Sequence, residues 1–181
     1  MMIKKGENRI VLILPAFNLV LKFPRADFKA ALNWIKWAIF NPKHWRHYLG
    51  GTVYHPGPKR YLFKGLVDNW KEYRFYRRTK HPFLQPTYCS FFGLCNVQRY
   101  GQPVNQDKLS FWVNLQDISD YEVTHDGHHF SNPDNFCLEN DQFKILDYAE
   151  PRTQKVILKV GLTLQRDYNQ NYTYTEEKSH G

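Results

Sequence analysis

The sequence predicts a fold of the α+β class, in which antiparallel strands and helices occupy separate stretches of the chain. Two pairs of short apolar runs, each joined by turn residues, indicate β-hairpins at 9–24 and 136–146. Two other stretches, 26–40 and 68–79, have the residue spacing of helices. At 181 residues, one domain with a sizeable core is expected.

The composition is that of a folded, basic protein. Hydrophobic residues make up 42% of the chain and aromatic residues 17%, which indicates folding rather than disorder. The net charge of +8 favours acidic partners, namely nucleotide phosphates, nucleic acid or an anionic membrane surface. Three cysteines without a C-x-x-C motif are typical of reduced thiols, so we expect a cytoplasmic protein. No apolar run reaches the roughly 18 residues of a transmembrane segment, and no signal peptide is expected.

The first hairpin places a lysine inside an apolar strand. Residues 9–14 and 19–24 are predicted strands, and 15–18 is the turn between them. Lys22 interrupts the second strand near its end, where a buried charge would need a partner. The commoner alternative is a strand-edge lysine that points to solvent.

The stretch 26–51 has two interpretations. Its first part, 26–40, is a predicted helix that begins near Asp27, and a second short helix could cover 43–49. One helix face repeats apolar residues, namely Phe28, Leu32, Ile35 and Ile39. Tryptophans and basic residues could form a surface for membrane or nucleic acid. We favour the alternative, an amphipathic helix packed on a sheet with its tryptophans in the core.

The middle of the chain contains a further predicted helix and further predicted strands. Glu72 lies in the predicted helix 68–79, either as the partner of a buried cation or as an exposed residue that balances nearby positive charges. Strands are predicted at 87–92, 96–100 and 155–160. The run 109–115 fits either a strand or a short buried helix.

The second hairpin brings two oxygen-bearing side chains together. Asn135 directly precedes its first strand and Asp147 follows its second, so the amide oxygen and the carboxylate are expected side by side. Hard oxygen donors of this kind can hold Mg²⁺, with waters and phosphate completing the shell. The alternative is an ordinary exposed hairpin with Asn and Asp at its turns.

Several of these segments resemble motifs of the protein kinases. The stretch 128–135 is similar to the catalytic loop H-R-D-x-x-P-x-N, and 147–149 to the D-F-G turn. Residues 20–22 resemble the V-A-I-K strand, and 81–84 resemble the H-P turn that follows the glutamate-bearing helix. The motifs occur in the order of the family, between residues 9 and 151.

The resemblance implies a minimal protein-kinase-like fold. Residues 1–168 would form a single domain, with an antiparallel N-lobe over about 1–101, a helical insertion at 26–51, and a truncated C-lobe over about 102–168; 169–181 would be a polar tail. The resemblance also implies that Lys22 contacts ATP phosphates and that Glu72 holds Lys22. Asn135 and Asp147 would hold Mg²⁺.

Three departures from the family pattern stand out. Phe130 occupies the position of the catalytic aspartate, and a phenyl ring cannot accept a proton. Asp126, four residues upstream, is the candidate catalytic replacement if the loop is rearranged. The chain has no Gly-rich loop, and we expect no room upstream of residue 9 for that loop and its first strand. It also lacks the A-P-E motif and the helices of a full C-lobe.

These departures favour a pseudokinase, a nucleotide-binding or regulatory module that could also bind a protein partner. One alternative is an active kinase for a small molecule, such as a sugar or lipid-sugar hydroxyl. Another is a basic protein that binds nucleic acid or a membrane surface. A less favoured alternative is a zinc site formed by ligands crowded within five positions, namely His125, Asp126, His128 and His129.

Overall fold

The structure is a computed structural model that describes residues 1–6, 8–41 and 58–173. It is of the predicted α+β class and divides into two compact units. Unit 1 comprises Met1–Tyr73 and Tyr88–Gln98, and unit 2 comprises Arg74–Thr87 and Arg99–Gly181. The short helix predicted at 43–49 lies outside the described residues.

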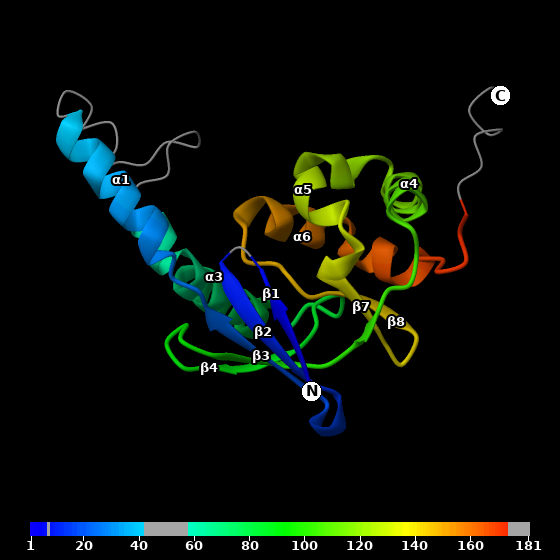
Figure 1. The fold of residues 1–181 in the computed structure, drawn as a ribbon. Coiled ribbons are helices and arrows are strands. Elements are labelled where there is room, and N and C mark those ends of the chain that lie inside the picture. The colour runs from blue at the N-terminus through cyan, green and yellow to red at the C-terminus, as the bar shows by residue number, and fades with distance from the viewer. Residues whose placement is uncertain (7, 42–57, 174–181) are drawn as a thin grey trace. The chain divides into compact units, whose positions relative to one another are not determined.

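Unit 1 is built on an antiparallel five-stranded sheet with strand order β1-β2-β3-β5-β4 (Figure 1). Its elements are β1 (Met2–Lys5), β2 (Arg9–Leu14), the 3₁₀ turn η1 (Pro15–Phe17), β3 (Leu19–Pro24), α1 (Phe28–Phe40), most of α3 (Pro58–Thr79), β4 (Thr87–Ser90) and β5 (Asn96–Arg99). The predicted β2–β3 hairpin is confirmed, with Val11 opposite Lys22. Asn18 closes its turn in the left-handed conformation.

The strand β1 corrects one expectation. It pairs antiparallel with β2, Met2 lying opposite Ile13, so a strand does precede residue 9. The connection is tight, because the Gly6 amide donates to the Arg9 carbonyl over 2.9 Å. Four residues, two of them lysines, are too few to show an alternating pattern, so no strand could be predicted here.

The helix α1 begins where predicted but packs through a different face. The Asp27 side chain accepts a hydrogen bond from the Ala30 amide and caps its start. Its buried side chains are Ala31 and Ala38, whereas the predicted apolar stripe is exposed. The interpretation of tryptophans buried in the core is wrong for Trp37, which is exposed. A periodic apolar pattern identifies a face but not what covers it.

The helix α3 is longer than predicted, because it begins at Pro58 rather than at 68. It approaches the sheet of unit 1 closely at Gly65. A Cβ atom there would lie 2.1 Å from the Asn8 carbonyl oxygen and 3.0 Å from Pro24 Cα. Only glycine permits this approach.

Unit 2 combines helices with a three-stranded sheet of order β6-β7-β8. Its elements are β6 (Gln102–Pro103), α4 (Lys108–Ser119), η3 (Glu122–Asp126), α5 (Gly127–Phe130), η4 (Pro133–Asn135), β7 (Phe136–Glu139), β8 (Gln142–Ile145) and α6 (Pro151–Asp167). The predicted second hairpin is confirmed, with Phe136 opposite Ile145. The ambiguous run 109–115 is helical, and the Asp107 side chain caps it.

The strand predicted at 155–160 is wrong, because this run lies inside α6. The buried residues of α6 follow a helical period, namely Thr153, Val156, Ile157, Gly161 and Leu164. A six-residue window rich in β-branched residues resembled a strand, and the longer window shows the helix that Pro151 begins.

Aromatic side chains fill the core of unit 2. Phe143 stacks on Tyr168 with ring centroids 3.7 Å apart, and Phe136 stacks on Phe143 at 5.1 Å. Part of the predicted polar tail is fixed here, since the Asn169 carbonyl accepts a hydrogen bond from Asn114 of α4 over 2.8 Å. Burial raises the pKa of Tyr168.

In the part of the chain that the structure describes, no helix combines the length and the apolar character that a membrane crossing requires.

Candidate functional site

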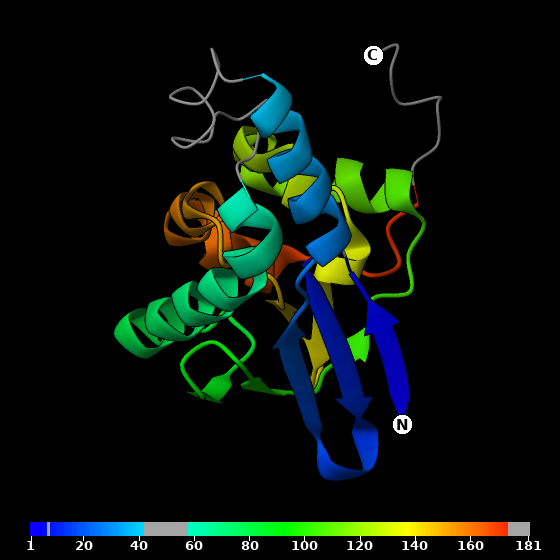
Figure 2. The same ribbon diagram turned by 60° about the vertical axis from the view of Figure 1, so that its left-hand side comes forward.

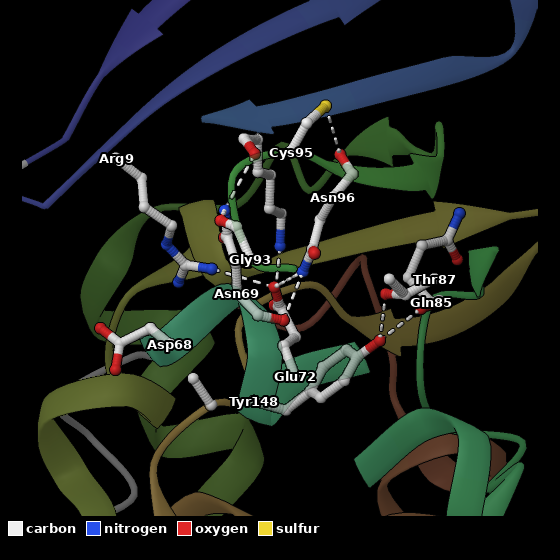
Figure 3. A network of polar contacts seen from close by, with 12 residues as sticks. Arg9, Asp68, Asn69, Glu72, Gln85, Thr87, Gly93, Cys95, Asn96 and Tyr148 are labelled. Atoms are coloured by element: carbon white, nitrogen blue, oxygen red, sulfur yellow. Dashed lines mark hydrogen bonds and ion pairs between the residues drawn. The ribbon is translucent and has the colours of Figure 1, made fainter. Parts of the chain in front are cut away.

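A buried carboxylate organises the polar network of unit 1. Glu72 of α3 is fully buried, and its Oε1 accepts a hydrogen bond from Lys22 Nζ of β3 over 2.7 Å. Its Oε2 accepts a second bond from Arg9 Nη1 of β2 over 2.9 Å (Figure 3). The predicted Lys22–Glu72 ion pair is therefore confirmed, and the alternative of an exposed helix glutamate is wrong.

Two asparagines fix the surroundings of this carboxylate. Asn69, one turn before Glu72 on α3, donates to the Lys22 carbonyl over 3.0 Å and to the Gly93 carbonyl over 2.9 Å. Asn96 of β5 donates to the Asn69 carbonyl over 2.7 Å and to Glu72 Oε2 over 3.4 Å (Figure 3). These side-chain bonds join helix, strand and turn, so the position of Lys22 is set from several directions.

In unit 2 the backbone joins the two ends of the β7–β8 hairpin. The Leu146 amide donates to the Asn135 carbonyl over 2.7 Å, which places Asn135 beside the residue that precedes Asp147. The side-chain nitrogen of Asn135 donates to the His129 carbonyl over 2.9 Å. The other polar atom of this side-chain amide is the oxygen Oδ1. An amide oxygen and a carboxylate at one hairpin end are the kind of ligands that Mg²⁺ takes.

Asp126 is held by two structural partners. Its side chain is largely buried, and Oδ1 lies 3.1 Å from His129 Nδ1, while Oδ2 accepts a short hydrogen bond from the Thr153 hydroxyl. The hydrogen bond to Asp126 raises the pKa of His129, burial opposes this rise, and the charges of Asp147 and Glu150 add to it. The two carboxylate oxygens of Asp126 are thus engaged by His129 of α5 and by Thr153 of α6.

Phe130 belongs to the core of unit 2. Its side chain is fully buried, and its ring centroid lies 5.7 Å from that of Phe136. The Phe130 side chain therefore points into the aromatic core.

The turn after β8 is anchored by a tyrosine. Tyr148, which follows Asp147, is fully buried, and its hydroxyl donates to the Gln85 carbonyl over 2.9 Å. The Thr87 hydroxyl lies 2.7 Å from the same oxygen (Figure 3). Because a tyrosine has a single O–H, Thr87 is the donor in this second bond.

The zinc alternative finds no support among the described residues. No group of three or more His, Cys, Asp or Glu side chains within residues 1–6, 8–41 and 58–173 is arranged to hold a metal ion. The His125 ring is mostly exposed and lies 3.8 Å from Glu122. A Mg²⁺ site with two protein ligands and phosphate oxygens does not need such a group.

No family model and no curated protein matches this chain. The roles of the candidate residues therefore rest on their chemistry, their geometry and the resemblance of their motifs.

Three members of the unit 1 network were missed by sequence reasoning. Arg9 opens an apolar strand, a position where arginines commonly reach solvent, and only its place opposite α3 makes it a partner of Glu72. Asn69 and Asn96 follow no motif. In the structure both side chains are buried, which marks them as members of the network. The sequence does not show whether a single polar residue is buried.

Proposed function

We propose that this protein is a kinase-like nucleotide-binding module, a pseudokinase that acts by binding or regulation rather than by phosphoryl transfer. The observation that carries the proposal is the buried ion pair of 2.7 Å between Lys22, on the third strand, and Glu72, on the helix that precedes β4. Protein kinases use a lysine on the third strand, paired with a helix glutamate, to bind nucleotide phosphates.

Each candidate residue then has a defined role. Lys22 contacts the phosphates of ATP, and Glu72 holds the ammonium group of Lys22 in place. Asn135 and Asp147 hold Mg²⁺ through their oxygens, and the ion neutralises phosphate charge. Mg²⁺ usually keeps several waters and takes only one or two protein carboxylates, which fits this small donor set.

Two features argue against catalysis. Phe130 is buried in the core, so no proton acceptor stands at the family position. The Asp126 oxygens already bind His129 and Thr153, which makes Asp126 a structural acceptor rather than a base. General-base assistance is typically worth about 10²–10⁴-fold, so a small-molecule kinase without it would be slow.

Cys89, Cys95 and Cys137 are free thiols. An odd number of cysteines without a C-x-x-C motif favours a reducing compartment, and we propose the cytoplasm as the site of action.

Isothermal titration calorimetry with ATP, in the presence and absence of Mg²⁺, tests the proposal. The wild type should bind weakly, with tighter binding when Mg²⁺ is present. Asp147→Asn should lose the Mg²⁺-dependent part of the affinity and keep most of the Mg²⁺-free part. Asp141→Asn, an exposed carboxylate in the turn of the same hairpin, is the matched control and should behave as the wild type.

Two results would contradict the proposal. Equal loss of affinity by Asp147→Asn in both conditions would remove the metal-ligand role. ATP turnover by the purified wild type that is lost in Asp147→Asn would favour the active kinase.

A further inference from the structure

The helix α1 exposes a continuous apolar stripe. Its four side chains are large and solvent-accessible, with Phe28 67%, Leu32 57%, Ile35 41% and Ile39 59% exposed. Their spacing of four, three and four residues places them on one face of the helix. Scattered exposed apolar residues are ordinary on protein surfaces, but a stripe along three helical turns indicates an interaction site.

The stripe is not the face through which α1 packs on its own unit. The side chains that α1 buries are those of Ala31 and Ala38, which are both 3% exposed. The Asp27 amide at its start donates to the Tyr61 carbonyl of α3 over 2.9 Å. In Figures 1 and 2, α1 extends away from β3 beyond the strands of the sheet. The apolar stripe is therefore available while the helix remains attached.

The two charged side chains within α1 are both positive. Lys29 and Lys36 are exposed and lie on one flank of it, seven residues and about two helical turns apart. Residues 28–40 contain no Asp or Glu. An apolar face bordered by lysines matches the boundary of an anionic bilayer, where acyl chains lie beneath negative headgroups.

The dimensions of the helix fit the surface of a bilayer rather than its interior. Thirteen residues make a helix of about 20 Å. The hydrocarbon core of a bilayer is about 30 Å thick. A helix of this length with one apolar face lies in the plane of the interface.

We propose that α1 docks this protein on an anionic lipid surface, with the stripe among the acyl chains and Lys29 and Lys36 at the headgroups. Nucleic acid fits less well, because three of the four stripe residues are aliphatic and offer no ring for base stacking. A second copy fits less well too, since symmetric pairing through α1 would bring the same lysines together. This proposal does not depend on nucleotide binding.

Co-sedimentation of the full-length protein with vesicles tests the proposal. One vesicle type contains phosphatidylcholine alone, and the other contains phosphatidylcholine and phosphatidylserine in equal parts. The wild type should pellet with the anionic vesicles far more than with the neutral ones. Raising the salt concentration should weaken the binding, because exposed charges are screened.

Matched variants separate the apolar part from the electrostatic part. Leu32→Glu should lower the partition coefficient roughly ten- to hundred-fold, the value of one buried leucine. Leu162→Glu on α6 is the control, because Leu162 has the same exposure of 57% on another helix and should leave binding unchanged. Lys29→Gln and Lys36→Gln should each lower binding to anionic vesicles about five-fold.

Other outcomes would overturn the proposal. These are the absence of wild-type binding to both vesicle types, equal effects of Leu32→Glu and Leu162→Glu, or loss of binding in Leu162→Glu alone. Light scattering that shows a dimer abolished by Leu32→Glu, without vesicle binding, would assign the stripe to self-association. Binding of a fluorescent oligonucleotide that Leu32→Glu abolishes, again without vesicle binding, would assign it to nucleic acid. If the Leu32→Glu variant unfolds, the proposal is tested by Lys29→Gln and Lys36→Gln. Unchanged binding of both lysine variants to anionic vesicles would then overturn it.

Discussion

Lys22 donates a hydrogen bond to Glu72 over 2.7 Å although 50 positions separate them in the chain. Arg9 binds the other oxygen of the same carboxylate. One buried acid thus joins β2, β3 and α3.

Replacement of Glu72 by glutamine should destabilise the protein strongly. The change would leave Lys22 and Arg9 without their anionic partner, and breaking a buried pair from one side costs about 3–5 kcal/mol. Urea denaturation would measure the free energy of unfolding. Glu122→Gln is the control, because Glu122 pairs with the exposed Lys159 and its loss should matter little. Similar effects of the two substitutions would show that Glu72 is not essential to unit 1.

Phe130→Ala should cost about 3–5 kcal/mol of stability, because it removes a fully buried ring from an aromatic core. Phe17→Ala, which truncates an exposed ring, should change the free energy of unfolding little. Phe130→Asp should not create a catalytic base, since it would bury a charge and unfold unit 2. A folded Phe130→Asp protein with wild-type stability would contradict the placement of this residue.

Gly65→Ala should lower the free energy of unfolding by about 1–3 kcal/mol, the usual cost of overpacking. The added methyl group would collide with the Asn8 carbonyl, which is backbone and cannot turn away. Gly127→Ala is the control, since its Cβ would meet Trp112 at an ordinary 3.6 Å. The thermal unfolding temperatures of the two variants would be compared. A Gly65→Ala protein with the unfolding temperature of the wild type would mean that α3 lies farther from Asn8 and from Pro24 of β3.

Two histidines should make the free energy of unfolding depend on pH in opposite directions. The pKa of His129 is raised by its hydrogen bond to Asp126, so its contribution is complete below the ordinary value of about 6.5 and is lost as the pH rises through the folded value. The pKa of His81 is lowered by burial, so its contribution is present above about 6.5 and is lost as the pH falls.

Urea midpoints measured on both sides of about pH 6.5 would separate the two effects. His129→Gln should flatten the alkaline side of the profile, and His81→Gln the acid side. A flattening on the same side by both substitutions would contradict the assignment. Mg²⁺ and nucleotide are left out of these experiments, so that only folding is measured.

The elements that could be predicted are those with a local pattern. The β2–β3 and β7–β8 hairpins and the start of α1 follow from apolar runs, turn residues and a capping aspartate. The first strand, β1, carries no such pattern because it is short and half polar. The helix α6 was misread in part, because a β-branched run outweighed the longer helical period.

Pairs of residues in the candidate site could be predicted from the sequence, but the hydrogen-bond network that surrounds them could not. Lys22 and Glu72 could be matched through the order of kinase-like motifs, and the ends of the second hairpin through its turn. The links that Arg9, Asn69 and Asn96 make are contacts between distant elements, which no spacing encodes. The inward direction of Phe130 likewise depends on the packing of its neighbours.

The anchored hydroxyl of Tyr148 has a consequence for the mobility of the turn that contains Asp147. In kinases the packing of the D-F-G phenylalanine switches between active and inactive arrangements. Here a swing of the ring would break the hydrogen bonds to the Gln85 carbonyl and to the Thr87 hydroxyl, at a net cost of about 0.5–1.5 kcal/mol each. A swung-out population would then amount to roughly a few per cent of the molecules. We therefore expect the turn after β8 to keep a single conformation in most molecules.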